Sequence, residues 1–425
     1  MRSLIATAAI LFACLCGVAQ PAPPPIDTLH LSVPEAEKLF LQRNLDLLAA
    51  KYNVDANKAL IQQAKLWDNP VLNTDQNIYD GKFFRHNNTY GQVFVQVQQL
   101  IRTAGKRSKL AQLATDNTAI AQAQFDDVVR SLHYTLLSDM IEVGHLGKII
   151  SLYSKQIVEV DKLVTGMEQV YQLGNISLKD NLRLKALLFG LQNDLLNVQS
   201  QVIPLQAELR LLLQTGDSTY IVPDLQYGID AMLSQQLPPV DSLVQAALSN
   251  RPDLKIATLN RDLQAHNIIY QKALAKPDLT IGPEYDQRSS YINHYVGLSV
   301  SLPLPLFNRN QGNIKSAEAS FKQTDTQVKQ QNSQVSGEVR SAIEQFLVLQ
   351  KVNSKELSDF AEKYDGLFQN MLKSYQARQI NLLDFTDFLD AYKETRLKLT
   401  EQQMNFVKAA ANLDFVTNQP IVPLQ

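Results

Sequence analysis

Two halves of the chain repeat the same order of sequence features, and this internal duplication limits the possible folds more than any other property. Tyr171 begins the segment YQLGNISLKD, and Tyr375 begins YQARQINLLD, so a Tyr, a Gln, an Ile, a Leu and an Asp recur 204 residues apart. Gly105 and Gly312 are separated by a similar distance along the chain. A near-constant separation over so long a stretch indicates one structural unit that is present twice.

The duplication divides the chain into predicted segments. The first repeat covers residues 32–215 and the second covers residues 240–417. Residues 216–239 between them are rich in Pro, Gly, Asp and Ser, so we predict a linker or equatorial segment there. Residues 418–425 form a short C-terminal tail.

The N-terminus has the pattern of a secretory signal peptide. A basic residue precedes an apolar run, and small residues precede the predicted cleavage after Ala19, so residues 1–19 are expected to be removed. Residues 20–31 are proline-rich and are expected to form an extended lead-in. Lipidation at Cys14 is the alternative, but the bulky Phe12 before it disfavours a lipoprotein signal.

The composition argues against several classes of function. Both cysteines, Cys14 and Cys16, lie in the predicted signal peptide, so the mature protein would have no thiol for a disulfide, a metal site or nucleophilic catalysis. A formal net charge of -2 disfavours nucleic acid as a partner. Beyond the signal peptide, no apolar run reaches the roughly 18 residues expected of a transmembrane helix.

Each repeat contains the same predicted elements. A helical stretch comes first, over residues 32–66 and 240–275, and a proline follows it. Two short strands come next. In the second strand of each pair, around residues 92–98 and 295–302, apolar and polar residues alternate with a period of two.

A long polar helical segment ends each repeat. In the first repeat it starts after Gly105 and is interrupted only at Gly174-Asn175 before it ends near Gln214. Apolar residues in its second arm alternate by four and three positions: Leu184, Leu188, Leu191, Leu195, Val198, Val202, Leu205, Leu209 and Leu212. This heptad pattern predicts coiled-coil packing. An arm of about 50 residues would extend roughly 75 Å.

The predicted strands limit the possible architectures. Each has an apolar and a polar face, four such strands cannot close a barrel, and an open sheet would leave backbone groups unpaired in lipid. The apolar faces can be buried against helices, or strands from several chains can be pooled into one closed barrel. Because the first arrangement would leave most of such long helices unsupported, we favour a membrane barrel with helices that project into the periplasm.

With these features the chain resembles the TolC-like outer-membrane factors. The resemblance depends on the duplicated helix–strand–strand–helix plan, on Gly105-Lys-Arg after the first strand pair, and on PLPLFNRNQG over residues 303–312 after the second. The repeated motifs at Tyr171 and Tyr375 also fit. The stretch at residues 303–312 is most similar to the heavy-metal branch of this family, which includes CusC and CzcC.

The resemblance implies a mainly α-helical fold with a transmembrane β-barrel part. Three chains would each supply strands to a twelve-stranded barrel in the outer membrane, and a long α-helical barrel would continue it into the periplasm. The implied function is a passive exit duct of a tripartite efflux system for metal cations or small toxic compounds. The implied partners are two further copies of the chain, a periplasmic adaptor, an inner-membrane RND-type pump and outer-membrane lipid, with no cofactor.

The resemblance also assigns roles to the repeated motif. In this family the second copy lines the periplasmic tip of the tunnel, so Asp384 and Asp387 are the candidate channel constriction, where carboxylate rings would attract cations. The family's gating arginine falls on Ile380 here, and its usual glycine falls on Arg378. The candidate gate links are Tyr375, Arg378, Asp180 and Tyr171. The candidate adaptor-docking tips are Gly174, Asn175 and Gln379.

Simpler interpretations of the same residues stay open. Ser177 and Asp180 have the spacing of a capping box, and so do Asn381 and Asp384, so helix capping alone could explain both aspartates. Asp387 lies three residues further along the same helix face and has no such explanation. A solvated helix face is the alternative to a gate.

Other functional classes fit the sequence less well. We predict no enzymatic activity, because the chain has no glycine-rich phosphate loop, no His-Glu-x-x-His and no nucleophile elbow. His86 and His294 occupy equivalent loops, where exposed polar loops explain them better than a metal site does. A soluble periplasmic coiled-coil scaffold is the alternative outside transport, but it would not require the predicted strands. A conduit for type I protein secretion is the main alternative within export.

Overall fold

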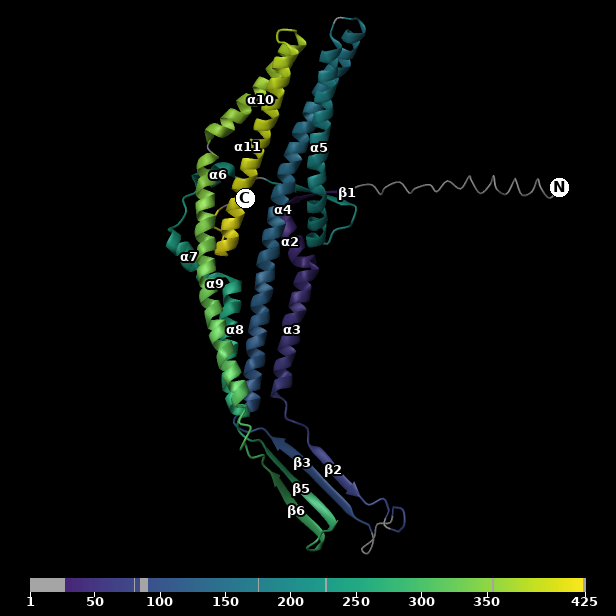
Figure 1. Cartoon of the computed structure of the whole chain (residues 1–425), viewed down its shortest axis with the longest axis vertical. Coiled ribbons are helices and arrows are strands. Elements are labelled where there is room, and N and C mark those ends of the chain that lie inside the picture. Colours follow the sequence, from purple (N-terminus) through teal and green to yellow (C-terminus); the bar gives the residue numbers. More distant parts are fainter. Residues whose placement is uncertain are drawn as a thin grey trace, which may run out of the picture. The chain divides into compact units, whose positions relative to one another are not determined.

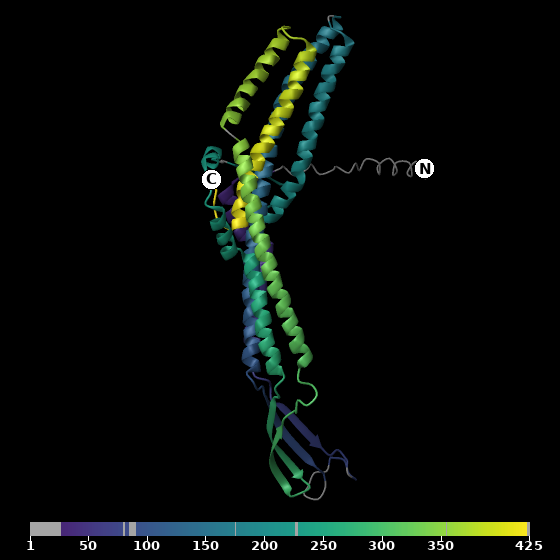
Figure 2. The same ribbon diagram turned by 60° about the vertical axis from the view of Figure 1, so that its left-hand side comes forward.

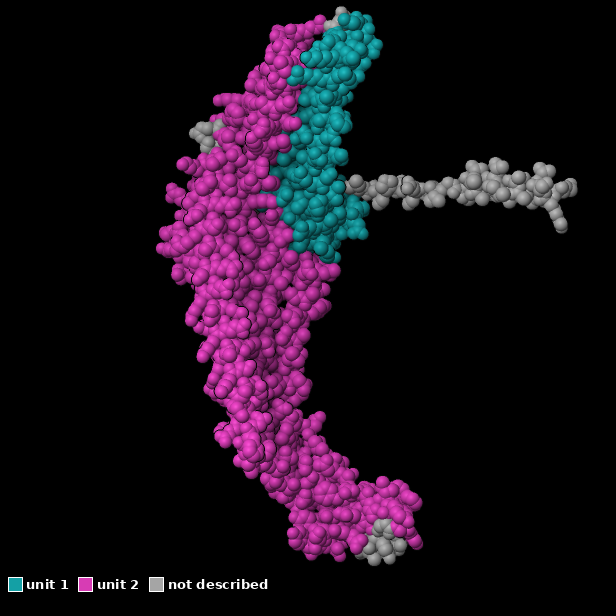
Figure 3. Space-filling view, in the orientation of Figure 1, with its two compact units in different colours: residues 1–42, 139–225 teal, residues 43–138, 226–425 magenta. Residues whose placement is uncertain are grey.

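The computed structural model describes residues 27–79, 81–84, 91–174, 176–225, 228–353 and 355–422. The predicted signal peptide, Asn175 and His86 lie outside these residues. The chain divides into two compact units, one of residues 1–42 and 139–225 and the other of residues 43–138 and 226–425 (Figure 3). The second repeat therefore lies wholly in the larger unit, whereas the first repeat is divided between the two.

The helices at the start of the two repeats are interrupted at equivalent positions. The sequence predicts one helical stretch in each repeat, but the structure has α2 (Val33–Arg43) and α3 (Leu45–Lys65) in the first, and α7 (Val240–Asn250) and α8 (Pro252–Leu274) in the second. Asn44 caps α3, because its side chain accepts a 3.0 Å hydrogen bond from the Leu47 N–H. A proline begins α8, where the absence of its N–H leaves no partner unsatisfied.

A four-stranded antiparallel sheet lies at one end of the larger unit (Figure 1). Its strands are β2 (Val71–Gln76), β3 (Val93–Ile101), β5 (Leu279–Arg288) and β6 (Asn293–Ser301), in the order β2-β3-β5-β6. The two repeats meet in the middle of the sheet, where β3 pairs with β5. Among the described residues, β2 and β6 each have one side without a strand partner.

The strand register separates an apolar face of the sheet from a polar one. Directly opposite residues of an antiparallel pair share a face. Three apolar residues of β6 therefore share a face with three residues of β5: Val296 with Tyr285, Leu298 with Pro283, and Val300 with Ile281. The three β6 side chains are 74%, 70% and 60% exposed. The alternation predicted along residues 295–302 is confirmed.

The other face of the sheet carries a polar hydrogen-bond network. Gln96 is central to it, because its side chain donates to Glu284 at 2.8 Å and accepts from Gln98 at 2.6 Å and from Asn73 at 3.4 Å. These bonds connect β2, β3 and β5 across their shared face. The sheet therefore has one surface suited to an apolar environment and one suited to water.

The long helices differ between the repeats. In the first repeat, α4 (Lys106–Gln172) has 67 residues, a length of about 100 Å. The equivalent segment of the second repeat is divided into α9 (Gln311–Val352) and α10 (Lys355–Gln376), a break that sequence patterns do not predict (Figure 1 and Figure 2). Asn353 is the C-cap of α9, where the backbone leaves the helical conformation with φ -85° and ψ 69°, and its side-chain amide donates to the Leu349 carbonyl at 2.8 Å. Among the described residues, every helix falls short of the combined length and apolarity that crossing a bilayer requires.

In the smaller unit, α5 (Leu178–Leu213) carries the predicted heptad seam on its buried face. Leu184 and Leu209 of this seam are 0% exposed. Leu182 and Phe189, which belong to the opposite side of the helix, are exposed. The coiled-coil pattern therefore identified the packed face of α5 correctly.

A parallel strand pair in the smaller unit was not predicted. It consists of β1 (Asp27–Ser32), in a segment expected to be an extended lead-in, and β4 (Thr219–Asp224), in the predicted linker. Gln206 fastens β4 to α5, because its buried side-chain amide exchanges hydrogen bonds of 2.7 and 2.8 Å with the carbonyl and N–H of Ile221.

A buried ion-pair cluster joins the start of α8 to α9 and to α11 (Leu382–Thr417). Arg251 is 4% exposed, and its guanidinium lies 2.6 Å from the carboxylates of both Asp253 and Glu338. It also donates to the Val416 carbonyl at 3.3 Å. Burial alone would raise the pKa of Asp253, but the hydrogen bonds and charge of Arg251 hold it below its usual value.

Candidate functional site

The turn between α10 and α11 carries several of the predicted site residues. At the end of α10, the N–H of Arg378 donates to the Tyr375 carbonyl at 3.0 Å, and the N–H of Gln379 donates to the Ser374 carbonyl at 2.9 Å. Arg378 has a φ of 59°, in the left-handed region that favours glycine. Gly174, at the equivalent place in the first hairpin, has a φ of 74°.

Helix α11 starts with a capped first turn. Asn381 is the N-cap, and its side chain accepts a 2.9 Å hydrogen bond from the N–H of Asp384. The Asn381 amide also donates to the Asp384 carboxylate at 2.9 Å. Ser177 and Asp180 make the same two contacts at the start of α5, at 3.1 and 2.7 Å. Asn381 and Ser177 are therefore the caps of the two helices, and the carboxylate of each motif aspartate contacts the side chain of its cap.

Aromatic residues hold α10 against α11. Tyr375, a candidate gate link, is 6% exposed, and its ring stacks on Phe385 with centroids 4.7 Å apart. Further from the tip, the Tyr392 hydroxyl donates to Asp365 at 2.7 Å, and Arg396 lies 3.2 Å from the same carboxylate. Burial, together with the bond to Asp365, raises the pKa of Tyr392. The structure thus gives Tyr375 a packing role within one hairpin.

The carboxylates at the start of α11 form an exposed acidic edge. Asp384 and Asp387 are both exposed, three residues apart on one helix. Asp390 follows at the same spacing and is also exposed, although the sequence analysis did not single it out. The repeated three-residue spacing was the signal that could have identified it, because such residues are neighbours on a helix surface. A surface of this kind attracts cations.

The first hairpin has a different polar network at its end. Glu168 on α4 accepts from Lys185 at 2.5 Å, from Asn181 at 2.9 Å and from Gln172 at 3.2 Å. These bonds, led by the one to Lys185, lower the pKa of Glu168 to about 2. Neither Glu168 nor Lys185 was among the predicted site residues, because the pairing of α4 with α5 is not visible in a local pattern.

Replacing Arg378 with glycine is expected to stabilise the second hairpin tip. A left-handed conformation costs a residue with a side chain about 1–2 kcal/mol, and glycine avoids that cost. In the Arg378→Gly variant, hydrogen exchange at the Gln379 amide should slow by about fivefold, since roughly 1 kcal/mol corresponds to that factor. Gly174→Ala, the matched change in the first hairpin, should accelerate local exchange. Equal exchange rates at Gln379 in both forms would show that the conformation of Arg378 is not strained.

Sequence comparison identifies the family. The family model for outer membrane efflux proteins matches residues 38–215 and 243–419. The chain belongs to the outer membrane efflux protein family. The chain is therefore an outer membrane efflux protein.

A curated relative lies in the branch that the sequence predicted. The cobalt-zinc-cadmium resistance protein CzcC of Cupriavidus metallidurans is 23% identical to the efflux protein over 287 residues. The match covers 68% of this chain and 66% of CzcC, slightly less than two thirds of that relative. The predicted heavy-metal branch is thereby supported.

Solved channel structures share the fold of the efflux protein. CusC has a TM-score of 0.72 at 17% identity, and the match covers 91% of each chain. VceC of Vibrio cholerae has a TM-score of 0.71 at 17% identity, with 92% of this chain and 96% of VceC covered. CmeC of Campylobacter jejuni has a TM-score of 0.74 at 10% identity, with 92% of this chain and 86% of CmeC covered. The predicted fold class, that of channels with an α-helical barrel and a β-barrel, is confirmed.

Proposed function

We propose that three copies of this efflux protein assemble into one closed duct across the outer membrane. The four-stranded sheet gives the main support for this proposal. Its β6 side chains Val296, Leu298 and Val300 are exposed on one face, while the opposite face is a polar network centred on Gln96. Its edge strands β2 and β6 each offer backbone groups for a further strand. Closing the sheet with strands of two other copies would pair these edges and turn the apolar face to lipid.

The acidic edge of α11 is proposed as the constriction of the duct. Three copies would bring Asp384 and Asp387 around one axis, where their charges would attract cations and repel anions. Tyr375, Arg378, Asp180 and Tyr171 are kept as candidate gate links, with the packing of Tyr375 on Phe385 favouring a supporting role for that residue. The hairpin tips at Gly174, Asn175 and Gln379 are the proposed docking points for an adaptor.

The proposed partners and cargo follow from the heavy-metal branch. A relative named for cobalt, zinc and cadmium resistance supports metal cations as cargo. An inner-membrane RND-type pump would supply the cargo, and a periplasmic adaptor would join pump and duct. A duct for type I protein secretion is the second candidate. In a deletion strain, loss of tolerance to divalent metals would support efflux, whereas unaltered tolerance with a retained secreted protein would favour secretion.

The assembly itself can be tested directly. The protein should fractionate with outer membrane, behave as a trimer by light scattering in mild detergent, and form conducting pores in planar lipid bilayers. A monomer recovered in the soluble periplasmic extract would contradict the duct, because the exposed face of β6 would then have no lipid to contact.

A further inference from the structure

Four connections between helices and strands lie side by side in the same order as the strands of the sheet. In the connection before β2, Asp68 forms a two-bonded ion pair with Arg102, in the connection after β3, at 2.7 and 2.8 Å. Thr103, next in that connection, donates from its N–H to Asp278, before β5, at 2.8 Å. The first three connections are thus joined to one another by side chains.

The fourth connection joins the end of this row. It runs from the end of β6 to the start of α9, over residues 302–310. The side-chain amide of Asn310 anchors it, donating to the backbone carbonyl and side-chain oxygen of Gln271, on α8, at 2.8 and 2.9 Å. The row therefore has two ends: the connection before β2, over residues 66–70, and the connection after β6.

Both ends of the row expose large apolar side chains. In the connection after β6, Phe307 is 91% exposed, and Leu304 and Leu306 are also exposed. In the connection before β2, Trp67 and Leu66 are exposed. Each end of the row therefore presents apolar side chains to its surroundings.

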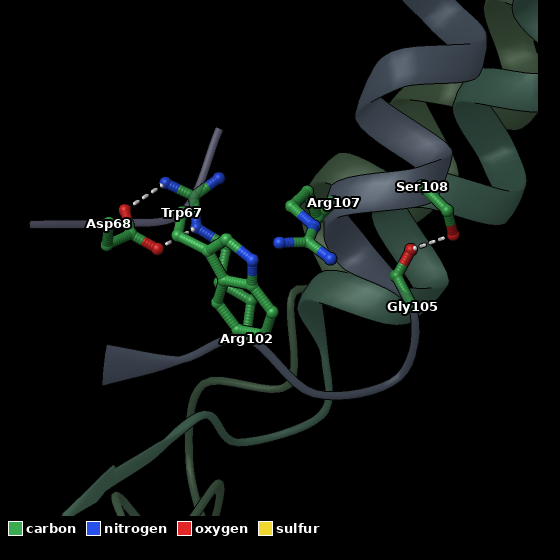
Figure 4. Close-up of a pocket in the computed structure, with 6 residues that line it drawn as sticks. All are labelled: Trp67, Asp68, Arg102, Gly105, Arg107 and Ser108. Carbon is green, nitrogen blue, oxygen red and sulfur yellow. Dashed lines mark hydrogen bonds and ion pairs between the residues drawn. The ribbon is translucent and has the colours of Figure 1, made fainter. Parts of the chain in front are cut away.

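A hollow lies beside Trp67 (Figure 4). Its lining consists of Trp67, Asp68, Arg102, Gly105, Arg107 and Ser108. The guanidinium carbon of Arg107 lies 3.9 Å from the Trp67 ring centroid. The hollow has a volume of about 150 Å³, which in size alone matches an apolar cavity that holds a benzene ring. A larger groove of about 470 Å³ adjoins it, with Leu60, Leu66 and Leu110 in its lining.

The internal duplication shows which segment fits there. Within one chain, the connection after the second strand of the first repeat contacts the connection before the first strand of the second repeat, through Thr103 and Asp278. If the repeats continue around a ring, the connection after β6 must meet the connection before β2 of the next copy, in a head-to-tail contact that closes. The connection after β6, residues 302–310, is also much longer than its counterpart, residues 102–105, and it contains the exposed Leu304, Leu306 and Phe307.

We propose that residues 302–310 of one copy dock on the next copy, with the Phe307 ring placed in the hollow beside Trp67 and Arg107. This inference rests on the proposed trimer. It names the contact between neighbouring copies at the connections between the sheet and the helices. An aromatic ring there would stack on the indole and lie near a guanidinium, both favourable contacts. Aromatic anchors that fill a pocket in the partner carry much of the binding energy of an interface.

Cysteine cross-linking tests this contact. The two native cysteines lie in the predicted signal peptide, so the introduced cysteines are expected to be the thiols that react. The full-length protein carrying Trp67→Cys and Phe307→Cys is extracted from outer membranes and treated with a short bismaleimide. The monomer band should convert to dimer and trimer bands in denaturing gels, and neither single variant should do so. A matched pair lies at the internal contact, where the Thr103 hydroxyl donates to the Pro277 carbonyl. Thr103→Cys with Pro277→Cys should react within one chain and leave the apparent mass unchanged.

Two outcomes would overturn the inference. The first is that the Trp67→Cys, Phe307→Cys variant is trimeric by light scattering but still runs as a monomer in the denaturing gel after treatment with the bismaleimide. The other is strong quenching of the indole fluorescence of a Trp67→Phe, Phe307→Trp variant by brominated phospholipid, which would put the loop in lipid. Absence of any trimer by light scattering would instead contradict the proposed duct, so the two failures are distinguishable.

Discussion

Replacing Arg251 with methionine is expected to lower the free energy of unfolding by about 3–5 kcal/mol, the usual cost of removing one member of a buried ion pair. Its guanidinium is 4% exposed and lies 2.6 Å from Asp253 and from Glu338. Methionine fills similar space but leaves both carboxylates without their main counter-ion. Thermal or urea unfolding of the detergent-solubilised protein, followed by circular dichroism, measures the loss.

The matched control is Arg340→Met. Arg340 lies 2.9 Å from Asp241, but the two side chains are 52% and 87% exposed. An exposed pair contributes about 0–1 kcal/mol, so this variant should unfold almost as the parent does. Equal losses in the two variants would contradict the idea that burial makes the Arg251 cluster important.

The Arg251 variant should also respond differently to pH. In the parent, the lowered pKa of Asp253 contributes stability above the pKa of the unfolded chain, and this stability is lost as pH falls through the folded value. Without Arg251 the pKa of the buried Asp253 should rise, because Arg130, at 3.8 Å, and the amide of Gln331, at 3.0 Å, replace little of its effect. The deficit of the variant relative to the parent should therefore shrink as pH falls.

Replacing Asp384 and Asp387 with asparagine is expected to weaken the cation preference of the duct by about tenfold at low salt. A narrow passage lined by one sign of charge raises the local concentration of counter-ions by a factor of about 10–1,000, and asparagine keeps the shape while removing the charge. The amide introduced by Asp384→Asn could still form a cap contact with Asn381 at the start of α11. Reversal potentials across a planar bilayer with a salt gradient give the permeability ratio.

The control for this variant removes the same charge from the same helix. Glu394 and Glu401 are exposed residues of α11 further from the tip, and their replacement by glutamine should leave the permeability ratio close to that of the parent. The effect at Asp384 and Asp387 should also fade in about 1 M salt, where charges are screened beyond roughly 3 Å. A variant that inserts and conducts with an unchanged ratio at low salt would exclude the constriction.

The features that could be predicted from the sequence are those that depend on patterns of neighbouring residues. The period-two strand of β6, the heptad seam through Leu184 and Leu209, and the capped starts of α5 and α11 all follow from residues close together in the chain. The internal duplication then allowed the order of elements in the whole chain to be predicted, because each predicted element in one repeat had a counterpart in the other.

The features that it missed depend on contacts between distant residues. The pairing of β1 with β4 is held partly by Gln206, and a lone glutamine in a polar helix gives no sign of that role. The network around Glu168 requires α4 and α5 to be side by side. The site residues Asp384 and Asp387 were identified by resemblance, and their role in conduction stays a prediction.

The alternation of the strands also limits how this protein can vary. One inserted or deleted residue within β6 would exchange the positions of Val296, Leu298 and Val300 with those of their polar neighbours, so single-residue length changes inside a strand should be lost during evolution. Connections have no such constraint. Residues 102–105 and 302–310 occupy equivalent places in the two repeats, and their unequal lengths are an example of a difference that a connection tolerates.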